Sequence, residues 1–115
     1  MAITLAALSL TGSAVAAPVE TVLYNFKGSP GDGFPAAGVI ANAQGALYGT
    51  TVLGGSHYAY GTVFKLTPPA KGQTAWTETV LYNLGNVTLA GLIFDEQGAL
   101  YGTTFEGGSS SNGTV

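Results

Sequence analysis

The sequence contains no cysteine and no arginine, and it has one histidine. The absence of cysteine excludes disulfide bonds, thiol catalysis and thiolate metal sites. A single histidine excludes metal sites built from several imidazoles and disfavours a serine–histidine–aspartate triad. We therefore expect no metal site, no cofactor and no catalytic residue. With three lysines and a net charge of −3, the chain also lacks the basic surface that nucleic-acid binding requires.

Charge of either sign is scarce. Charged residues make up 8% of the chain, against about a quarter in a typical soluble domain. Disordered chains combine low hydrophobicity with high net charge, and this chain has 46% hydrophobic residues. Its 18 glycines suit tight turns, where a positive φ is needed. The composition favours a folded protein of many short strands.

The N-terminal segment is apolar but too short to cross a bilayer, which takes about 20 residues. Residues 3–17 carry no charge, and Ala14-Val15-Ala16 has the small-x-small form of a signal-peptidase site. We predict that residues 1–17 are a signal peptide and that the mature chain begins at Ala17 or Pro18. No basic residue precedes the apolar run, so either the true start lies upstream or the α-amino group supplies the charge. The alternative is a first strand or helix of the mature domain.

Two segments recur almost letter for letter. Residues 20–26 (ETVLYNF) return as 78–84 (ETVLYNL), and residues 44–51 (QGALYGTT) return as 97–104. The two copies differ in length only in a Gly- and Pro-rich connection, which marks a loop. We therefore divide the chain into a complete repeat unit at 18–77 and a second unit at 78–115 that stops inside its last strand. This division predicts a fragment of a longer array, with further repeat units as neighbours.

Each unit predicts four short strands that are rich in β-branched and aromatic residues. In the first unit they cover residues 20–26, 38–41, 46–52 and 61–67, and in the second residues 77–84, 91–95 and 99–105, with the fourth beginning at 113. No helical periodicity is present after residue 20. We expect an all-β fold of tandem four-stranded antiparallel repeats that form β-propeller-like blades. An open β-solenoid or a small sandwich is the alternative.

Two turns carry specific signals. Residues 42–45 and 95–98 each end in glycine, as a hairpin turn with positive φ demands. Asp95 takes the place of Asn42, an exchange typical of turns in which the side chain bonds the local backbone. We therefore interpret Asp95 as a turn residue rather than as a catalytic acid.

The order Leu47-Tyr48-Gly49-Thr50-Thr51, then Gly54-Gly55, then residues 61–68 (GTVFKLTP) and 78–82 (ETVLY) resembles the GloVer-type tandem repeat of exported bacterial proteins. The resemblance covers residues 20–115. It implies a propeller-like fold and export through the bacterial inner membrane to the cell surface or the medium. It implies no catalytic residues for this chain. The second copy departs from the pattern at residues 85–89, which lack the Asp-Gly-x-x-Pro stretch.

The remaining candidate residues are weighed by their place in the repeat. Glu20 and Glu78 are equivalent, which favours a structural role, and Asp32 is too isolated for a calcium loop. Four tyrosines also recur at equivalent positions, which is typical of packing between blades; they are Tyr24, Tyr48, Tyr82 and Tyr101.

Aromatic residues in the variable stretches form the candidate ligand-contact loop, because loops carry function in repeat proteins; they are His57, Tyr58, Tyr60 and Trp76. We expect a non-enzymatic, exported interaction module whose partner is an unknown protein or glycan. The alternative is a glycan-binding lectin or a secreted hydrolase with its site in the loops or in further units.

Overall fold

The computed structural model describes residues 2–7, 10–12, 14–56 and 60–115, and within these ranges the chain is all-β with no helix. Every strand pair is antiparallel. The described part therefore contains no helix that could cross a membrane. The strands are β1 (Ala2–Ala7), β2 (Leu10–Thr11), β3 (Ala14–Val15), β4 (Val19–Asn25), β5 (Ile40–Ala41), β6 (Leu47–Thr50), β7 (Thr62–Thr67), β8 (Thr77–Asn83), β9 (Ile93–Phe94) and β10 (Leu100–Tyr101).

The largest sheet is a four-stranded meander in the order β5-β6-β7-β8, which we call the central sheet. It crosses the predicted boundary between the units, because β8 begins at Thr77 and belongs to the second copy of the repeat. The connection from β7 to β8 is a short loop, residues 68–76, and strands joined by short loops tend to pair. The sheet thus joins the last three strands of one unit to the first strand of the next.

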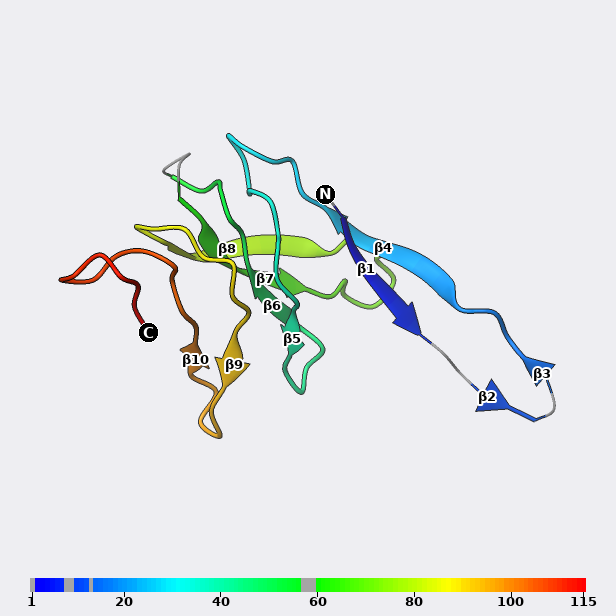
Figure 1. Ribbon diagram of the computed structural model, residues 1–115. Helices are drawn as coiled ribbons and strands as arrows, with labels where there is room; N and C mark the ends of the chain where they lie inside the picture. Colours follow the sequence, from blue (N-terminus) through cyan, green and yellow to red (C-terminus); the bar gives the residue numbers. More distant parts are fainter. Residues whose placement is uncertain (1, 8–9, 13, 57–59) are drawn as a thin grey trace.

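The other strands form two-stranded sheets: β1 with β4 (the first sheet), β2 with β3, and β9 with β10 (the last hairpin). Figure 1 shows the first sheet on one side of the central sheet and the last hairpin on the other. The described residues do not show a second four-stranded sheet or a closed ring. The expectation that the four strands of one unit form one sheet is therefore corrected: β4 pairs with β1 instead of β5, and β8 completes the central sheet.

The core lies between the first sheet and the central sheet. Phe26, Leu47, Phe64 and Leu66 are buried together, and Ile3 is among the partly buried side chains that pack against them. The alternation along β7 explains this, because successive side chains of a strand point to opposite faces. Phe64 and Leu66 on one face are fully buried, whereas Val63 and Lys65 on the other face are half-buried.

The two predicted turns are confirmed. The side-chain Oδ1 of Asn42 accepts hydrogen bonds from the backbone N–H groups of Gln44 (3.1 Å) and Ala46 (2.9 Å). Asp95 Oδ1 accepts the equivalent bonds from residues 97 (3.0 Å) and 99 (2.8 Å). The glycines that close these turns have φ of 79° at residue 45 and 84° at residue 98. The repeat therefore reproduces local geometry as well as sequence.

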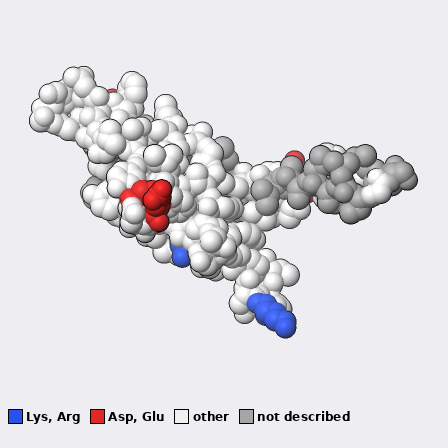
Figure 2. All heavy atoms as spheres, turned by 90° about the horizontal axis from the view of Figure 1, so that it is seen from below, with Lys and Arg blue, Asp and Glu red and all other residues white. Residues whose placement is uncertain are grey.

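The predicted signal segment lies partly in strands, with β1 paired along β4. This pairing neither requires nor excludes removal of the segment during export, so the signal peptide stays a prediction. Charged side chains are few on the face of the molecule that Figure 2 shows, as the composition indicates.

Candidate functional site

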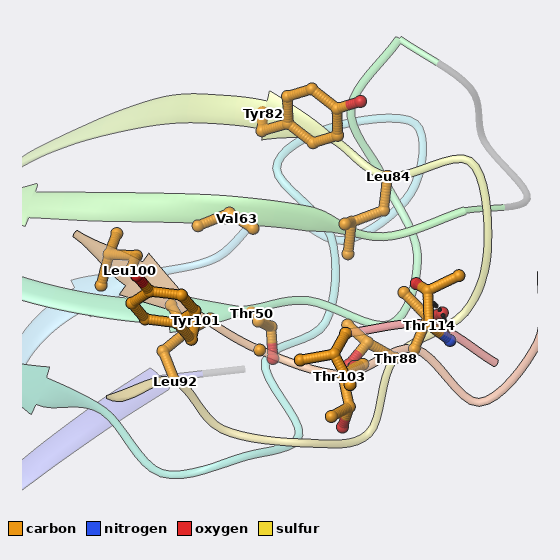
Figure 3. A pocket seen from close by; sticks show the side chains of 13 residues that line it. Thr50, Val63, Tyr82, Leu84, Thr88, Leu92, Leu100, Tyr101, Thr103 and Thr114 are labelled. Atoms are coloured by element: carbon orange, nitrogen blue, oxygen red, sulfur yellow. Dashed lines mark hydrogen bonds between the residues drawn. The ribbon is translucent and has the colours of Figure 1, made fainter. Parts of the chain in front are cut away.

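An apolar cavity of about 400 Å³ lies between the central sheet and the last hairpin. Val63 on β7, Tyr82 on β8 and Leu84 just after β8 form one wall. The other wall comes from the last hairpin and the residues beside it; it includes Leu92, Leu100, Tyr101 and Gly102. Figure 3 shows these side chains around the cavity. A space of this size holds an aromatic ring, since an engineered apolar cavity of about 150 Å³ binds benzene.

Some residues that line the cavity are the repeat equivalents of residues in the core on the other side of the central sheet. There, Phe64 packs edge-on against Phe26, with their ring centroids 5.0 Å apart. The Phe64 ring lies so close to Gly49 that a Cβ on this glycine would be 2.6 Å from the ring. Residues 84 and 102 are the repeat equivalents of Phe26 and Gly49, and both line the cavity. Two residues that line the cavity are therefore the repeat equivalents of the two residues that contact the Phe64 ring.

Large apolar side chains around the cavity are unusually exposed. Tyr82 is 65% exposed and Tyr101 is 48% exposed. Their equivalents in the first unit are only partly exposed: Tyr24 packs on the core, and Tyr48 contacts Phe94 at 5.1 Å between ring centroids. The expected packing role of the four recurring tyrosines therefore holds for the first unit. In the second unit, the same residue type borders an open apolar surface.

Threonine hydroxyls fix the position of the last hairpin relative to the central sheet. The hydroxyl of Thr50, at the end of β6, donates to the carbonyl oxygen of Ala90 (2.8 Å). Thr88 is 2% exposed, and its hydroxyl donates to the carbonyl oxygen of Thr103 (2.6 Å) and accepts from the N–H of Ala90 (3.2 Å). One of these bonds thus joins the central sheet to the chain beside the last hairpin, and the others hold that part of the chain together.

A second polar cluster lies beside the core. The hydroxyl of Tyr24 donates to Asp32 Oδ2 (2.6 Å), and the backbone N–H of Lys27 donates to Asp32 Oδ1 (2.6 Å). Burial raises the pKa of Tyr24, and the hydrogen bond to Asp32 raises it further. Burial also raises the pKa of Glu78, and the negative charge of Asp32 raises it further. These contacts engage both oxygens of Asp32, which supports a structural role for this residue.

The structure separates the described members of the candidate ligand-contact loop. Tyr60 lies just before β7, is 37% exposed and has interactions of its own. Trp76 lies just before β8 and packs against the core cluster. Since Thr62 pairs with Asn83 and Thr67 with Thr77, the two residues flank opposite ends of the β7–β8 ladder. His57 and Tyr58 lie outside the described residues, so a ligand contact at this loop stays a prediction.

No family model, no curated protein and no solved structure matches this chain. The resemblance to the GloVer-type repeat therefore stays a prediction as well. Among the described residues, no three side chains of the kinds that bind metals gather at one place.

The sequence pattern does not point to the cavity, because most of its lining residues belong to matched strands, which favour packing. One signal was present: Leu84 replaces Phe26 at the position that faces the Phe64 ring in the first unit. Comparing core residues across the repeat, instead of loop residues, would have indicated this site.

Proposed function

We propose that this chain is a non-enzymatic, exported interaction module of propeller-like repeat units. It binds an extended polypeptide segment, of the kind that the fourth strand of a repeat unit supplies, through the apolar cavity between the central sheet and the last hairpin. The observation that carries this proposal is the match between the cavity and the Phe64 site of the first unit. Both have a large apolar side chain at one wall, Phe26 or Leu84, and a glycine at the other. Exposed Tyr82 and Tyr101 add apolar contact area around it.

The binding is tested with N-acetyl-phenylalanine amide as the probe and methyl-group NMR of the full chain as the readout. We expect the probe to shift the methyl signals of Leu92 and Leu100, and N-acetyl-aspartate amide to leave them unchanged. Tyr101→Asp places a charge at the cavity and should abolish the shifts. Leu81→Asp alters a residue of similar exposure, 45%, that does not line the cavity, and should preserve them. Unchanged methyl signals with the phenylalanine probe would refute the proposed site.

A glycan ligand is the alternative occupant, because exposed tyrosines such as Tyr82 and Tyr101 can stack on sugar rings. Titrating the same NMR sample with cello-, chito- and manno-oligosaccharides separates the two. Shifts of Leu92 and Leu100 with an oligosaccharide but not with the phenylalanine probe would replace the polypeptide partner by a glycan.

Export is tested separately by expressing the full chain in a bacterium and sequencing the N-terminus of the protein outside the inner membrane. We expect it to begin at Ala17 or Pro18, because Ala14-Val15-Ala16 has the form of a signal-peptidase site. Retention of the whole chain in the cytoplasm would contradict the export proposal and leave the cavity proposal standing.

A further inference from the structure

The first sheet repeats the β7–β8 pairing of the central sheet residue by residue. In β7–β8, Val63 pairs with Tyr82 and Phe64 pairs with Val80, with a bulge at this step. In β1–β4, Ile3 pairs with Tyr24 and Thr4 with Val22, with the bulge at the same step. The strands β4 and β8 are copies of one repeat segment, so their partners β1 and β7 occupy equivalent places.

The strands β1 and β7 share this register although their sequences differ. β1 reads AITLAA and β7 reads TVFKLT. The match includes the bulge although the sequences of β1 and β7 are unlike, which indicates that the segment shared by β4 and β8 favours this register. One face of each strand also has equivalent surroundings. Ile3 and Val39 line a cavity of about 270 Å³ beside the first sheet, and their equivalents Val63 and Leu92 line the cavity of about 400 Å³.

The opposite faces of β1 and β7 differ. Phe64 is fully buried, because its ring packs against Phe26, which directly follows β4. Thr4 takes the equivalent place on β1 and is exposed. A polar residue at that point suits a strand position that no side chain of another sheet covers. The backbone of β1 therefore pairs as the fourth strand β7 does, but β1 has no large apolar side chain at the position of Phe64.

We infer that the edge of β4 is an acceptor site for the fourth strand of another repeat unit, an extended segment of the pattern Thr-Val-Phe-Lys-Leu-Thr, and that Ala2–Ala7 occupies this site in the present chain. An unoccupied strand edge presents a row of backbone N–H and C=O groups that another strand can pair with. Removal of the predicted signal segment would take β1 away and open this edge. The register match carries the inference independently of the cavity and of export.

Binding is tested with a fluorescein-labelled peptide of sequence Gly-Thr-Val-Phe-Lys-Leu-Thr-Pro and the full chain, by fluorescence anisotropy. Ile3→Asp weakens β1 because it introduces a charge where Ile3 packs on the core. We expect this variant to bind the peptide at least tenfold more tightly than the unaltered chain. The reason is that β1 competes from within the same molecule at an effective concentration of about millimolar. Thr4→Ser, at an exposed position of β1, should bind like the unaltered chain.

The fluorescence of Trp76, which packs on the core, reports whether the Ile3→Asp variant keeps that core. Unchanged Trp76 emission together with no gain in peptide binding would overturn the inference.

The register is tested in chains that keep β1 intact. The peptide carries cysteine in place of lysine, activated as a mixed disulfide with thiopyridine. A cysteine thiolate on the chain attacks the cysteine sulfur of the peptide, and thiopyridone leaves. The disulfide between chain and peptide therefore accumulates even when the peptide displaces β1 only transiently. Lys65 pairs with Thr79, the equivalent of Thr21. We expect Thr21→Cys to react at least tenfold faster than Val19→Cys, which lies two residues away in the same strand. Equal rates would refute the proposed register, including in the case where Ile3→Asp does not fold.

Discussion

Replacing Phe64 by alanine tests the statement that this ring is the centre of the core. Phe64 is 0% exposed and packs edge-on against Phe26 at 5.0 Å between centroids. Phenylalanine-to-alanine substitutions in cores cost about 3–5 kcal/mol, and the cost rises with the cavity that remains. Here the neighbour across the ring is Gly49, which has no side chain that could move into the space. We therefore expect a value near the upper end, about 4–5 kcal/mol of unfolding free energy.

The measurement is urea unfolding followed by the fluorescence of Trp76, which packs against the same core cluster. Phe105→Ala is the control, because Phe105 is 73% exposed and its loss should cost less than about 0.5 kcal/mol. Phe64→Leu serves if the alanine variant does not fold, and we expect it to cost about 1–1.5 kcal/mol because it nearly conserves volume. A loss below about 2 kcal/mol for Phe64→Ala would refute the packing described here, and with it the equivalence between this core and the open cavity.

Three further predictions concern features that the repeat presents twice. Thr51→Val removes the hydroxyl that accepts from the buried N–H of Thr62 (3.0 Å) and bonds its hydroxyl (2.9 Å), and should lower the free energy of unfolding by about 1–3 kcal/mol. The matched variant Thr104→Val removes the equivalent bonds to Thr114, and one to the carbonyl oxygen of Glu106 (2.6 Å), at a more exposed site. It should cost less than about 1 kcal/mol in the same urea titration, and equal costs would contradict the role of burial. Hydrogen bonds from the backbone of Ala99, from Tyr101 and from the turn lower the pKa of Asp95. The ionised Asp95 therefore stabilises the fold above the unfolded-state pKa, and this contribution is lost as the pH falls through the lower folded-state pKa. The free energy of unfolding should accordingly depend less on pH between about pH 5 and pH 2 in Asp95→Asn. An unaltered pH profile in this variant would contradict the hydrogen bonds to Asp95. Gly45→Ala and Gly98→Ala place a Cβ at φ of 79° and 84° and should each cost about 1 kcal/mol by thermal unfolding, while no change in either would contradict the turn assignment.

The sequence predicted the local elements well, because their signals are local. The segments around β4, β6, β7 and β8 were found, and the turns closed by Gly45 and Gly98 were placed correctly. The exchange of Asn42 for Asp95 was interpreted correctly, since both side chains bond the backbone of their own turn. In each case the interacting atoms lie within a few residues of one another.

Strand partnership and burial were not predictable from the same patterns. The grouping of four strands within one unit was wrong, because the edge of β4 is taken by β1 and β8 completes the central sheet. Tyr24 and Tyr82 occupy the same place in the repeat, yet one packs on the core and the other is exposed. Their surroundings come from residues far away in the chain, which no repeat alignment contains.

The sequence by itself determined that this protein is built of short strands, that two segments of it adopt the same turns, and that disulfide bonds and thiol chemistry are excluded. These conclusions follow from composition, backbone preferences and short-range hydrogen bonds. Only the tertiary structure decided which edges pair and which side chains are covered, because both depend on what lies opposite each strand. That is how it showed an apolar cavity lined by the equivalents of Phe26 and Gly49, and Ala2–Ala7 paired along β4 in the register of β7 along β8.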